Sequence, residues 1–378
     1  MTITPINTNT KTDLLALTLP QLRAWIVEHG EAAFRAKQLY NWLYQRLSTD
    51  FAQMSNLPQS LRELLAREAS IGPMIVRSEL HSKDDRTRKI LLELADGKLI
   101  ESVLMLYPPY GENSARATVC VSTQAGCAFG CTFCATGQMG FDRHLSAGEI
   151  VAQVLFFARE LRSAPWTAAG LPGSTPIDHI TNIVLMGMGE PLHNYNNVLQ
   201  ALRILNSAEG FNLGARHMTV STVGLVPAIR KLSHEPLQVN LAISLHAPTD
   251  ELRSQTMPIN RKYPVQELIA ACKDYIAATR RQVTFEYVLL AGVNDTAEYA
   301  HRLGELLAPL KQFAHVNCIP VNATSASYRT PGPEAIRAFR AILFEHGISN
   351  SVRAERGDDI AAACGQLRTR FENVQASK

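Results

Sequence analysis

Three cysteines lie within eight residues of one another in the segment GCAFGCTFCATGQMG. They are Cys127, Cys131 and Cys134, and their spacing is C-x3-C-x2-C. A structural zinc site needs four ligands, and the next candidate, His144, has no paired partner beside it, so zinc is the weaker interpretation. A 4Fe-4S cluster takes one thiolate per iron, and three thiolates leave one iron open to a small molecule. The spacing therefore favours an iron-sulfur cluster that also binds a substrate or cofactor.

Short β-branched runs alternate with amphipathic stretches beyond Ala117. The candidate strands are ATVCVST, HITNIVLMG, RHMTVST, QVNLAISLH, QVTFEYVLL and HVNCIPV. This alternation predicts parallel pairing through right-handed crossovers, and six such units predict an α/β fold, a partial (β/α)6 barrel. Sheets of this kind place their sites at the C-terminal ends of the strands, and the three cysteines follow the first run.

The residues before the barrel divide into two parts. Apolar residues three and four apart predict helices from about residue 14 to 68, and period-two alternation predicts a β-hairpin from about residue 75 to 106. The expected organisation is a helical module at 1–70, a β-hairpin and linker at 71–110, the barrel at 111–350 and a C-terminal segment at 351–378.

The composition predicts a cytoplasmic protein without a membrane partner. No apolar run approaches the ~20 residues of a spanning helix. The start, MTITPINTNTKTDLLAL, lacks the features of a secretory signal. Seven cysteines in that compartment stay reduced, so a clustered set is expected to bind metal or do chemistry. A net charge of +3 is too small to predict nucleic-acid binding from bulk charge.

The cysteine motif at the end of the first strand resembles that of the radical S-adenosylmethionine superfamily. The resemblance implies that the three cysteines hold a 4Fe-4S cluster, whose open iron binds the amino and carboxylate groups of S-adenosylmethionine. It also implies that an electron from the cluster cleaves this cofactor to a 5′-deoxyadenosyl radical. Cofactor contacts are implied at the ends of the later strands, at Gly189 and Glu190 in MGMGEPL, Ser221 in TVSTVG, and Ser244, Leu245 and His246 in ISLHAP.

Each of these residues also has a purely structural interpretation. Glu190 before a proline is typical of a helix start, Ser221 of a cap, and His246 of a hydrogen-bonded core histidine. Their shared location at strand ends favours the cofactor interpretation.

Two further cysteines extend the resemblance. The segments TVCVSTQAGCAFGCTFCATG, GMGEPL, SLHAP and RGDDIAAACGQL are similar to the RlmN and Cfr family of adenine-methylating RNA methyltransferases, most closely to its dual-specificity RlmN type. The resemblance covers nearly the whole chain. It implies that Cys364 takes a methyl group from one S-adenosylmethionine, and that a second one yields the radical that activates this methyl for addition to carbon 2 of adenine. Cys120 then releases the product through a transient disulfide with Cys364. Cys272 and Cys318 lack such motifs and are expected to be small buried hydrophobes.

The same family pattern points to two more residues. Glu101 in LIESVLML matches the glutamate that removes the displaced ring proton, although a strand-edge carboxylate has the same appearance in the sequence. Asn322 matches a cofactor contact, but Ala323 follows it where the family more often has proline.

The implied substrates are 23S ribosomal RNA and the anticodon stem-loop of transfer RNA. Both would present an unstacked adenine, as reaction at a ring carbon requires. Part of the RNA surface is expected in the N-terminal module, at Arg35, Lys37 and Arg46. The interleaved aromatics Tyr40, Trp42 and Tyr44 more often form a core than stacking platforms. An external flavodoxin-like or ferredoxin-like electron donor and a monomeric state are also expected.

Two alternatives remain open at the level of the sequence. An enzyme of the Cfr type uses the same cysteines but methylates carbon 8 of adenine. A noncatalytic RNA-binding protein would use the cysteines for a structural metal site.

Overall fold

The structure of the chain is a computed structural model that describes residues 11–72, 74–111, 114–167, 175–322, 328–353 and 357–367. Ala323, half of the segment SAPWTAAGLPGSTP and the last part of the expected C-terminal segment lie outside these ranges. Within the ranges, no helix combines the length and apolar character needed to cross a bilayer.

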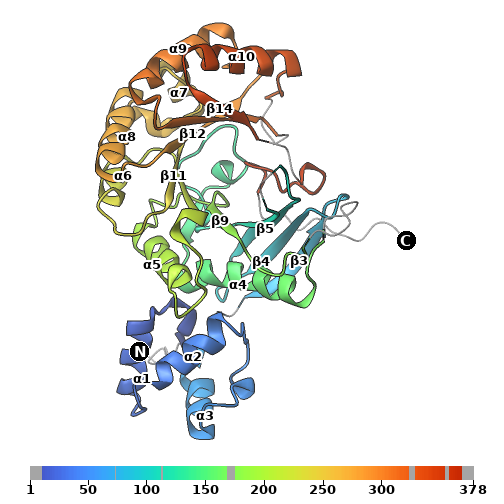
Figure 1. Cartoon of the computed structure of the whole chain (residues 1–378), viewed down its shortest axis with the longest axis vertical. Coiled ribbons are helices and arrows are strands. Elements are labelled where there is room, and N and C mark those ends of the chain that lie inside the picture. Colours follow the sequence, from blue (N-terminus) through green and yellow to red (C-terminus); the bar gives the residue numbers. More distant parts are fainter. Residues whose placement is uncertain are drawn as a thin grey trace, which may run out of the picture.

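One mixed sheet forms the centre of the molecule, and in the described part of the chain it has ten strands (Figure 1). Its parallel part runs, in spatial order, through β6 (Arg116–Cys120), β9 (Asn182–Leu185), β10 (Met218–Thr222), β11 (Asn240–Ser244), β12 (Val283–Leu289), β13 (Ala314–Pro320) and β14 (Ser349–Val352). The first six are the predicted barrel strands, and β14 is an addition that the sequence analysis missed. Because β6 and β14 do not pair, the barrel is partial, as predicted.

Helices carry the chain back between parallel strands, and Figure 1 shows them along the outer side of the curved sheet. They are α4 (Ala147–Ser163), α5 (Tyr195–Asn206), α6 (Val226–Leu232), α7 (Asp250–Thr256), α8 (Val265–Thr279), α9 (Ala297–Leu307) and α10 (Pro333–Glu345). The helix α4 begins with a capping box. The Ser146 hydroxyl accepts from the Glu149 backbone N–H, and the Glu149 carboxylate accepts from the Ser146 backbone N–H.

The region of the predicted hairpin belongs to the same sheet. Its strands pair antiparallel in the order β3 (Ile75–His81), β4 (Thr87–Glu93) and β5 (Leu99–Tyr107), and β5 pairs antiparallel with β6. Val103 of β5 lies opposite Cys120 of β6. Since side chains alternate along a strand, Glu101 projects from the same face as Val103 and Cys120.

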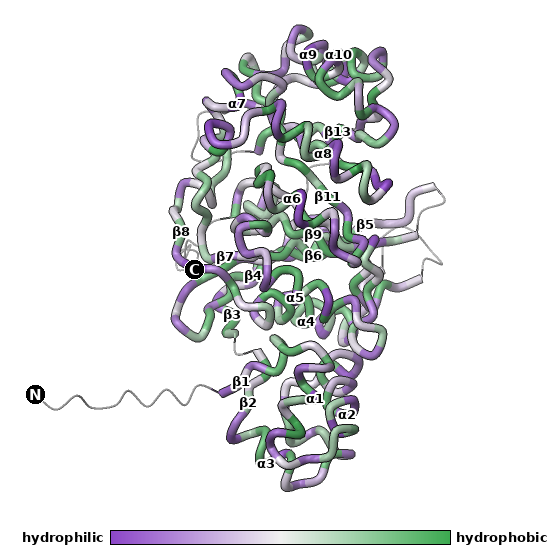
Figure 2. Tube along the Cα trace, turned by 90° about the vertical axis from the view of Figure 1, so that its left-hand side faces the viewer, coloured by the Kyte–Doolittle hydropathy of each residue, from purple (hydrophilic) through white to green (hydrophobic). Residues whose placement is uncertain are grey.

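A group of helices precedes the sheet, and Figure 2 shows it at one end of the molecule, away from α9 and α10. It contains α1 (Leu19–Glu28), α2 (Arg35–Tyr44) and α3 (Gln59–Glu68), with a short parallel pair of β1 (Thr12–Asp13) and β2 (Ala69–Ser70). The α2 aromatics Tyr40, Trp42 and Tyr44 are buried in the core of this group. They are therefore not free to stack on RNA bases.

A small hairpin encloses the cysteine loop. It pairs β7 (Gln124–Gly126) antiparallel with β8 (Phe141–His144), and the backbone N–H of Cys127 donates to the carbonyl of Gly140 at 2.7 Å. Gly126 has a φ of +74°, and a Cβ there would lie 2.1 Å from the Gly140 carbonyl oxygen. Only glycine allows the two strands to meet at this point, so Gly126 fixes where the loop begins.

Candidate active site

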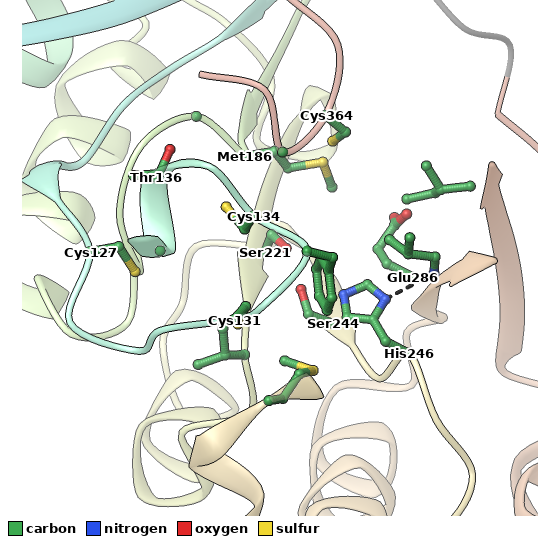
Figure 3. A pocket seen from close by; sticks show the side chains of 18 of the residues that line it. Cys127, Cys131, Cys134, Thr136, Met186, Ser221, Ser244, His246, Glu286 and Cys364 are labelled. Atoms are coloured by element: carbon green, nitrogen blue, oxygen red, sulfur yellow. Dashed lines mark hydrogen bonds between the residues drawn. The ribbon is translucent and has the colours of Figure 1, made fainter. Parts of the chain in front are cut away.

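A cavity with an empty volume of about 950 Å³ opens at the C-terminal ends of the parallel strands (Figure 3). The three loop cysteines line it, together with every expected cofactor residue except Leu245. These residues come from the loop after β7, the turn after β9 and the ends of β10, β11 and β13. The location is the one that parallel sheets favour for their sites.

The three loop cysteines form a donor set that fits a cluster. Burial raises the pKa of Cys127 to about 12, and it also raises the pKa values of Cys131 and Cys134, because an uncharged thiol is favoured away from water. Within the described ranges, no three His, Cys, Asp or Glu side chains are grouped closely enough to hold a single metal ion. In a 4Fe-4S cluster each thiolate binds a different iron. The arrangement therefore suits a cluster better than zinc.

Glu190 is held by backbone N–H groups at the edge of the cavity. Its Oε1 accepts from Leu192 at 3.0 Å, and its Oε2 accepts from Val223 at 2.8 Å. Burial nevertheless raises the pKa of Glu190 to about 7. The preceding Gly189 has a φ of +99°, and a Cβ there would lie 2.5 Å from the Cβ of Gln124. This close approach lets the Gln124 side chain accept from the Glu190 N–H at 2.8 Å.

His246 presents a neutral imidazole to the cavity. Its Nδ1 accepts from the backbone N–H of Val288 at 3.0 Å, so the ring proton is on Nε2. Burial lowers the pKa of His246 to about 3. Its backbone φ of 58° lies in the left-handed region. The His246 carbonyl accepts a hydrogen bond from Asn294 Nδ2 at 2.9 Å, which holds the backbone in place. The ring packs edge-on against Phe133, with 4.8 Å between centroids. His246 can therefore donate one hydrogen bond to a ligand.

Leu245 differs from its neighbours. Ser244 and His246 line the cavity, but the Leu245 side chain is fully buried in the hydrophobic core. Alternation along β11 and its continuation turns this one side chain to the other face. The structure therefore does not bring the Leu245 side chain into the candidate site, whereas Ser221 at the end of β10 does line the cavity.

Arg253 joins the strand ends and was not identified from the sequence. It is fully buried on α7. Its Nη2 donates to the carbonyls of Val223 at 2.7 Å and Ser244 at 3.1 Å, and its Nε donates to that of Leu245 at 3.1 Å. Burial lowers the pKa of Arg253 to about 10, so the side chain stays charged at neutral pH. In the sequence it is an arginine in a short helical stretch, and no pattern there distinguishes a buried arginine from an exposed one.

Cys120 and Cys364 line a second, smaller cavity together. Cys120 ends β6, and Cys364 belongs to the segment 357–367. Cys364 also lines the larger cavity, so it is common to both. All seven cysteines are free thiols, and the expected disulfide between Cys120 and Cys364 is therefore not present in this structure. Cys272 and Cys318 are fully buried, as predicted.

The 357–367 segment is docked on the cysteine loop. The Ala135 N–H donates to the Gly365 carbonyl at 2.8 Å, and the Thr136 hydroxyl donates to the Leu367 carbonyl at 2.6 Å. Asn322 Nδ2 donates to the Cys364 carbonyl at 3.1 Å. Among the described residues, Asn322 Oδ1 is buried without a hydrogen-bond partner. A ligand donor in the cavity would satisfy this atom, which fits the expected cofactor contact.

Arg353 contacts Cys364 directly and was also missed by the sequence analysis. Its Nη1 lies 3.4 Å from Cys364 Sγ and 3.6 Å from Met186 Sδ. The nearby Glu286 is buried, and its carboxylate accepts from Asn317 Nδ2 at 2.8 Å. Figure 3 shows Met186 beside Cys364. A cationic donor therefore faces the sulfur of Cys364.

Glu101 lies outside both cavities, two residues before Val103, which pairs with Cys120. Its carboxylate forms an ion pair with Lys89 at 3.0 Å, and both side chains are buried. Lys89 Nζ also donates to the carbonyl of Ala361 at 3.1 Å. The Lys89–Glu101 pair therefore contacts the segment that carries Cys364.

Comparisons with known families match two parts of the chain. Residues 12–71 match the "Ribosomal RNA large subunit methyltransferase N-terminal domain", and residues 176–303 match the "Radical SAM superfamily".

Curated relatives and one solved structure match nearly the whole chain. A relative from Geobacillus thermodenitrificans, named "Probable dual-specificity RNA methyltransferase RlmN", is 49% identical, covering 94% of this chain and 93% of its own length. A relative of the same name from Roseiflexus castenholzii is 45% identical, covering 97% and 98%. The crystal structure of a radical SAM methyltransferase from Sphaerobacter thermophilus has a TM-score of 0.87 and 48% identity, covering 94% of this chain and 99% of that one.

Proposed function

This chain belongs to the RlmN family of radical S-adenosylmethionine RNA methyltransferases, and on that basis we propose that it methylates carbon 2 of adenine in 23S ribosomal RNA and in the anticodon loop of transfer RNA. One observation carries the proposal. Cys364 lines the cavity of the three loop cysteines and also the cavity of Cys120. A residue that carries a methyl group must meet both the centre that activates it and the thiol that releases it.

The residues around the larger cavity would hold the cofactors. Cys127, Cys131 and Cys134 are the proposed cluster ligands, and the proposed S-adenosylmethionine contacts are Gly189, Glu190, Ser221, Ser244, His246, Asn322 and the backbone of Leu245. When bound, the 4Fe-4S cluster and S-adenosylmethionine supply a 5′-deoxyadenosyl radical, which takes a hydrogen atom from a methyl group. Two molecules of S-adenosylmethionine are used per product in this proposal, one as methyl donor and one as radical source.

Cys364 is the proposed methyl carrier. Its thiolate attacks the methyl carbon of the sulfonium, a carbon–sulfur bond forms, and the neutral thioether of S-adenosylhomocysteine leaves. Arg353 Nη1, 3.4 Å from Cys364 Sγ, supports this role because a guanidinium favours the charged sulfur that attacks. The methyl carbon of Cys364, once activated, adds to carbon 2 of the adenine.

Cys120 and Glu101 are the proposed residues for product release. Restoring the aromatic ring requires loss of one electron, for which the oxidised cluster would be the acceptor, and of the proton on carbon 2, whose removal we assign to the Glu101 carboxylate. The Cys120 thiolate then attacks the sulfur of Cys364. A sulfur–sulfur bond forms, the carbon–sulfur bond breaks, and its electron pair leaves with the carbon, which takes up a proton to become the methyl group. An external dithiol reduces this disulfide to two thiols and is itself oxidised to a disulfide.

The remaining proposals concern the setting of the enzyme. We propose that an external electron donor of the flavodoxin or ferredoxin kind reduces the cluster. We also propose that the enzyme is cytoplasmic and monomeric. The N-terminal module, with Arg35, Lys37 and Arg46, is proposed to contribute to RNA binding. Its match to a methyltransferase N-terminal domain supports this assignment.

Anaerobic reconstitution with iron and sulfide, followed by assay on both RNA classes, tests the proposal. Mass spectrometry of the digested RNA should find methyl at carbon 2 of one adenine in each class. Methyl at carbon 8 would assign the chain to the Cfr type of activity instead. A redox-inert metal with no 5′-deoxyadenosine formed from S-adenosylmethionine would contradict catalysis of this kind.

A further inference from the structure

A third cavity opens at the opposite end of the barrel, where the parallel strands begin. It has an empty volume of about 1620 Å³, and its lining carries five arginines but only one carboxylate, that of Glu286. Four of these arginines stand around its entrance, and together they form what we call the arginine mouth: Arg116, Arg216, Arg280 and Arg281. This charge is local, because the net charge of the whole chain is only +3.

The strands themselves connect the arginine mouth to the candidate active site. On β11, Asn240 and Ala242 line the mouth cavity, and Ser244 lines the cofactor cavity. On β12, Thr284 lines the mouth cavity and Val288 the cofactor cavity, with Glu286 lining both. Alternate residues of one strand share a face. The inner face of the barrel is therefore one continuous surface from the mouth to the cofactor end.

The mouth cavity also adjoins the small cavity of Cys120 and Cys364. Met105, Tyr107, Met186 and Arg353 line the mouth cavity and also the small cavity that contains Cys120 and Cys364. The guanidinium of Arg116 lies over the ring of Tyr107, 4.8 Å from its centroid. Met105, Tyr107 and Met186 thus give the wall between the arginines and Cys364 an apolar and aromatic surface, against which a flat base can pack.

The arginines of the mouth converge without acidic partners. Arg281 Nη2 donates to Asn240 Oδ1 at 3.0 Å, and Asn240 Nδ2 donates to the carbonyl of Arg216 at 2.7 Å. Among the described residues, Arg281 Nη1 is buried with no hydrogen-bond partner, and none of the four arginines forms an ion pair. Burial and the charge of Arg216 both lower the pKa of Arg281. Like charges held close together in this way favour a bound anion.

At the other end of the barrel, the 357–367 segment lies beside the cofactor cavity. This segment is bound to the cysteine loop through the Ala135–Gly365 and Thr136–Leu367 hydrogen bonds. The cofactor residues occupy the remaining wall there. A polyanionic substrate therefore meets compatible charge at the mouth rather than at the cofactor end.

We infer that the arginine mouth is the phosphate-binding entrance for single-stranded RNA. Its guanidiniums bind the phosphates that flank the target adenine while the flipped base passes between Tyr107, Met105 and Met186 toward Cys364. The inference rests on the proposed function for the identity of the base. It adds a substrate-binding site on the barrel to the RNA surface proposed on the N-terminal module. Arginine suits this role because its planar fork matches phosphate oxygens.

Binding of an anticodon stem-loop RNA tests the inference, measured by fluorescence anisotropy with the reconstituted protein at several salt concentrations. The variant Arg216→Ala/Arg281→Ala should bind more weakly by about tenfold for each arginine removed. The slope of log affinity against log salt should fall by about 0.7 for each phosphate that the variant no longer binds. The matched control is Arg337→Ala on α10, whose exposed side chain lies outside all three cavities, and it should bind as the unmodified protein does.

A second measurement does not depend on loss of binding. A photo-crosslinking amino acid in place of His217, which is exposed next to Arg216, should crosslink to nucleotides beside the target adenine. The same group in place of Arg337 should not. Equal affinity for the double variant and the control, together with no crosslink from position 217, would overturn the inference and leave RNA binding to the N-terminal module.

Methylation by the unmodified protein, assayed in parallel, separates this inference from the proposed function. If that protein methylates RNA while the double variant binds RNA as tightly as the control does, the inferred RNA entrance is refuted and the proposed function is retained. If it methylates neither RNA class, the proposed function fails, and the affinities and crosslinks still decide whether RNA enters at the mouth.

Discussion

Arg353 donates a hydrogen bond to Cys364, with 3.4 Å between Nη1 and Sγ. Arg353 follows directly on β14, the last strand of the sheet, whereas Cys364 is on the segment beyond it. The contact therefore ties the proposed methyl carrier to the rigid part of the barrel. It also places a fixed positive charge where the attacking sulfur must be ionised.

We predict that Arg353→Met slows methylation of Cys364 by about ten- to a hundredfold, the usual effect of losing a hydrogen bond to a charged group. Arg353→Lys should recover part of the rate, since lysine keeps the charge but not the fork. The mass of the intact protein after incubation with S-adenosylmethionine and reductant, without RNA, measures the methylated fraction. Arg302→Met, an exposed change on α9, is the control. Equal rates for Arg353→Met and this control would show that the contact has no chemical role.

Replacing the two thiols of the small cavity should give opposite results. Cys120→Ala should leave RNA covalently attached to the protein, because the attack that releases the product is lost. Cys364→Ala should form neither adduct nor product. Denaturing gels of the reaction with labelled RNA distinguish the two outcomes. Cys272→Ala removes a buried thiol on α8 that lines neither cavity, and it should release methylated RNA normally. Normal release by Cys120→Ala would contradict its role.

Glu190 should make the cluster-free protein less stable as the pH rises. Burial raises the pKa of this carboxyl from 4.5 to about 7, so the folded state holds the proton more tightly than the unfolded chain does. The penalty is absent below the unfolded pKa of 4.5, grows as the pH rises, and is complete above about 7. It amounts to roughly 3 kcal/mol.

Urea unfolding of Glu190→Gln against the unmodified protein, at about pH 5 and about pH 8, measures this penalty. The stability of the unmodified protein relative to the variant should fall between the two conditions. Glu267→Gln, an exposed position on α8, should show no such change. A relative stability that rises with pH would mean that the carboxyl is favoured as an ion in the folded protein.

Arg253→Ala should destabilise the cluster-free protein by at least about 3 kcal/mol, because buried carbonyls lose their charged donor. It should also abolish S-adenosylmethionine binding, since Val223 and Ser244 on the cavity wall are no longer held together. Urea denaturation and equilibrium dialysis measure the two effects. Arg230→Ala breaks an exposed ion pair with Asp274 and should cost no more than about 1 kcal/mol. Similar costs for the two variants would refute the bridging role of Arg253.

The barrel strands and the cysteine loop could be predicted from the sequence because each has a local sequence pattern. β-branched runs marked β6 and β9 to β13, and the cysteine spacing marked the loop. Pairing across distant segments has no such signature. Nothing in the alternation of β3 to β5 indicates that they extend the sheet beside β6, and β14 is too short to stand out as a strand.

The two buried or partly buried arginines of the site were missed for a related reason. Arg253 and Arg353 act through carbonyls and a sulfur that are near only after folding. An arginine in the sequence is expected at the surface, so its type gave no indication of these contacts. Leu245 is a different case: a family motif names it, and its side chain lies in the core, so a cofactor contact from this residue would come from its backbone.

The position of Cys364 beyond β14 has a consequence for biosynthesis. During translation the loop thiols and the strands that hold them leave the ribosome before the methyl-carrying thiol does. The cysteine loop can therefore fold before the segment that docks on it through Gly365 and Leu367 has been synthesised.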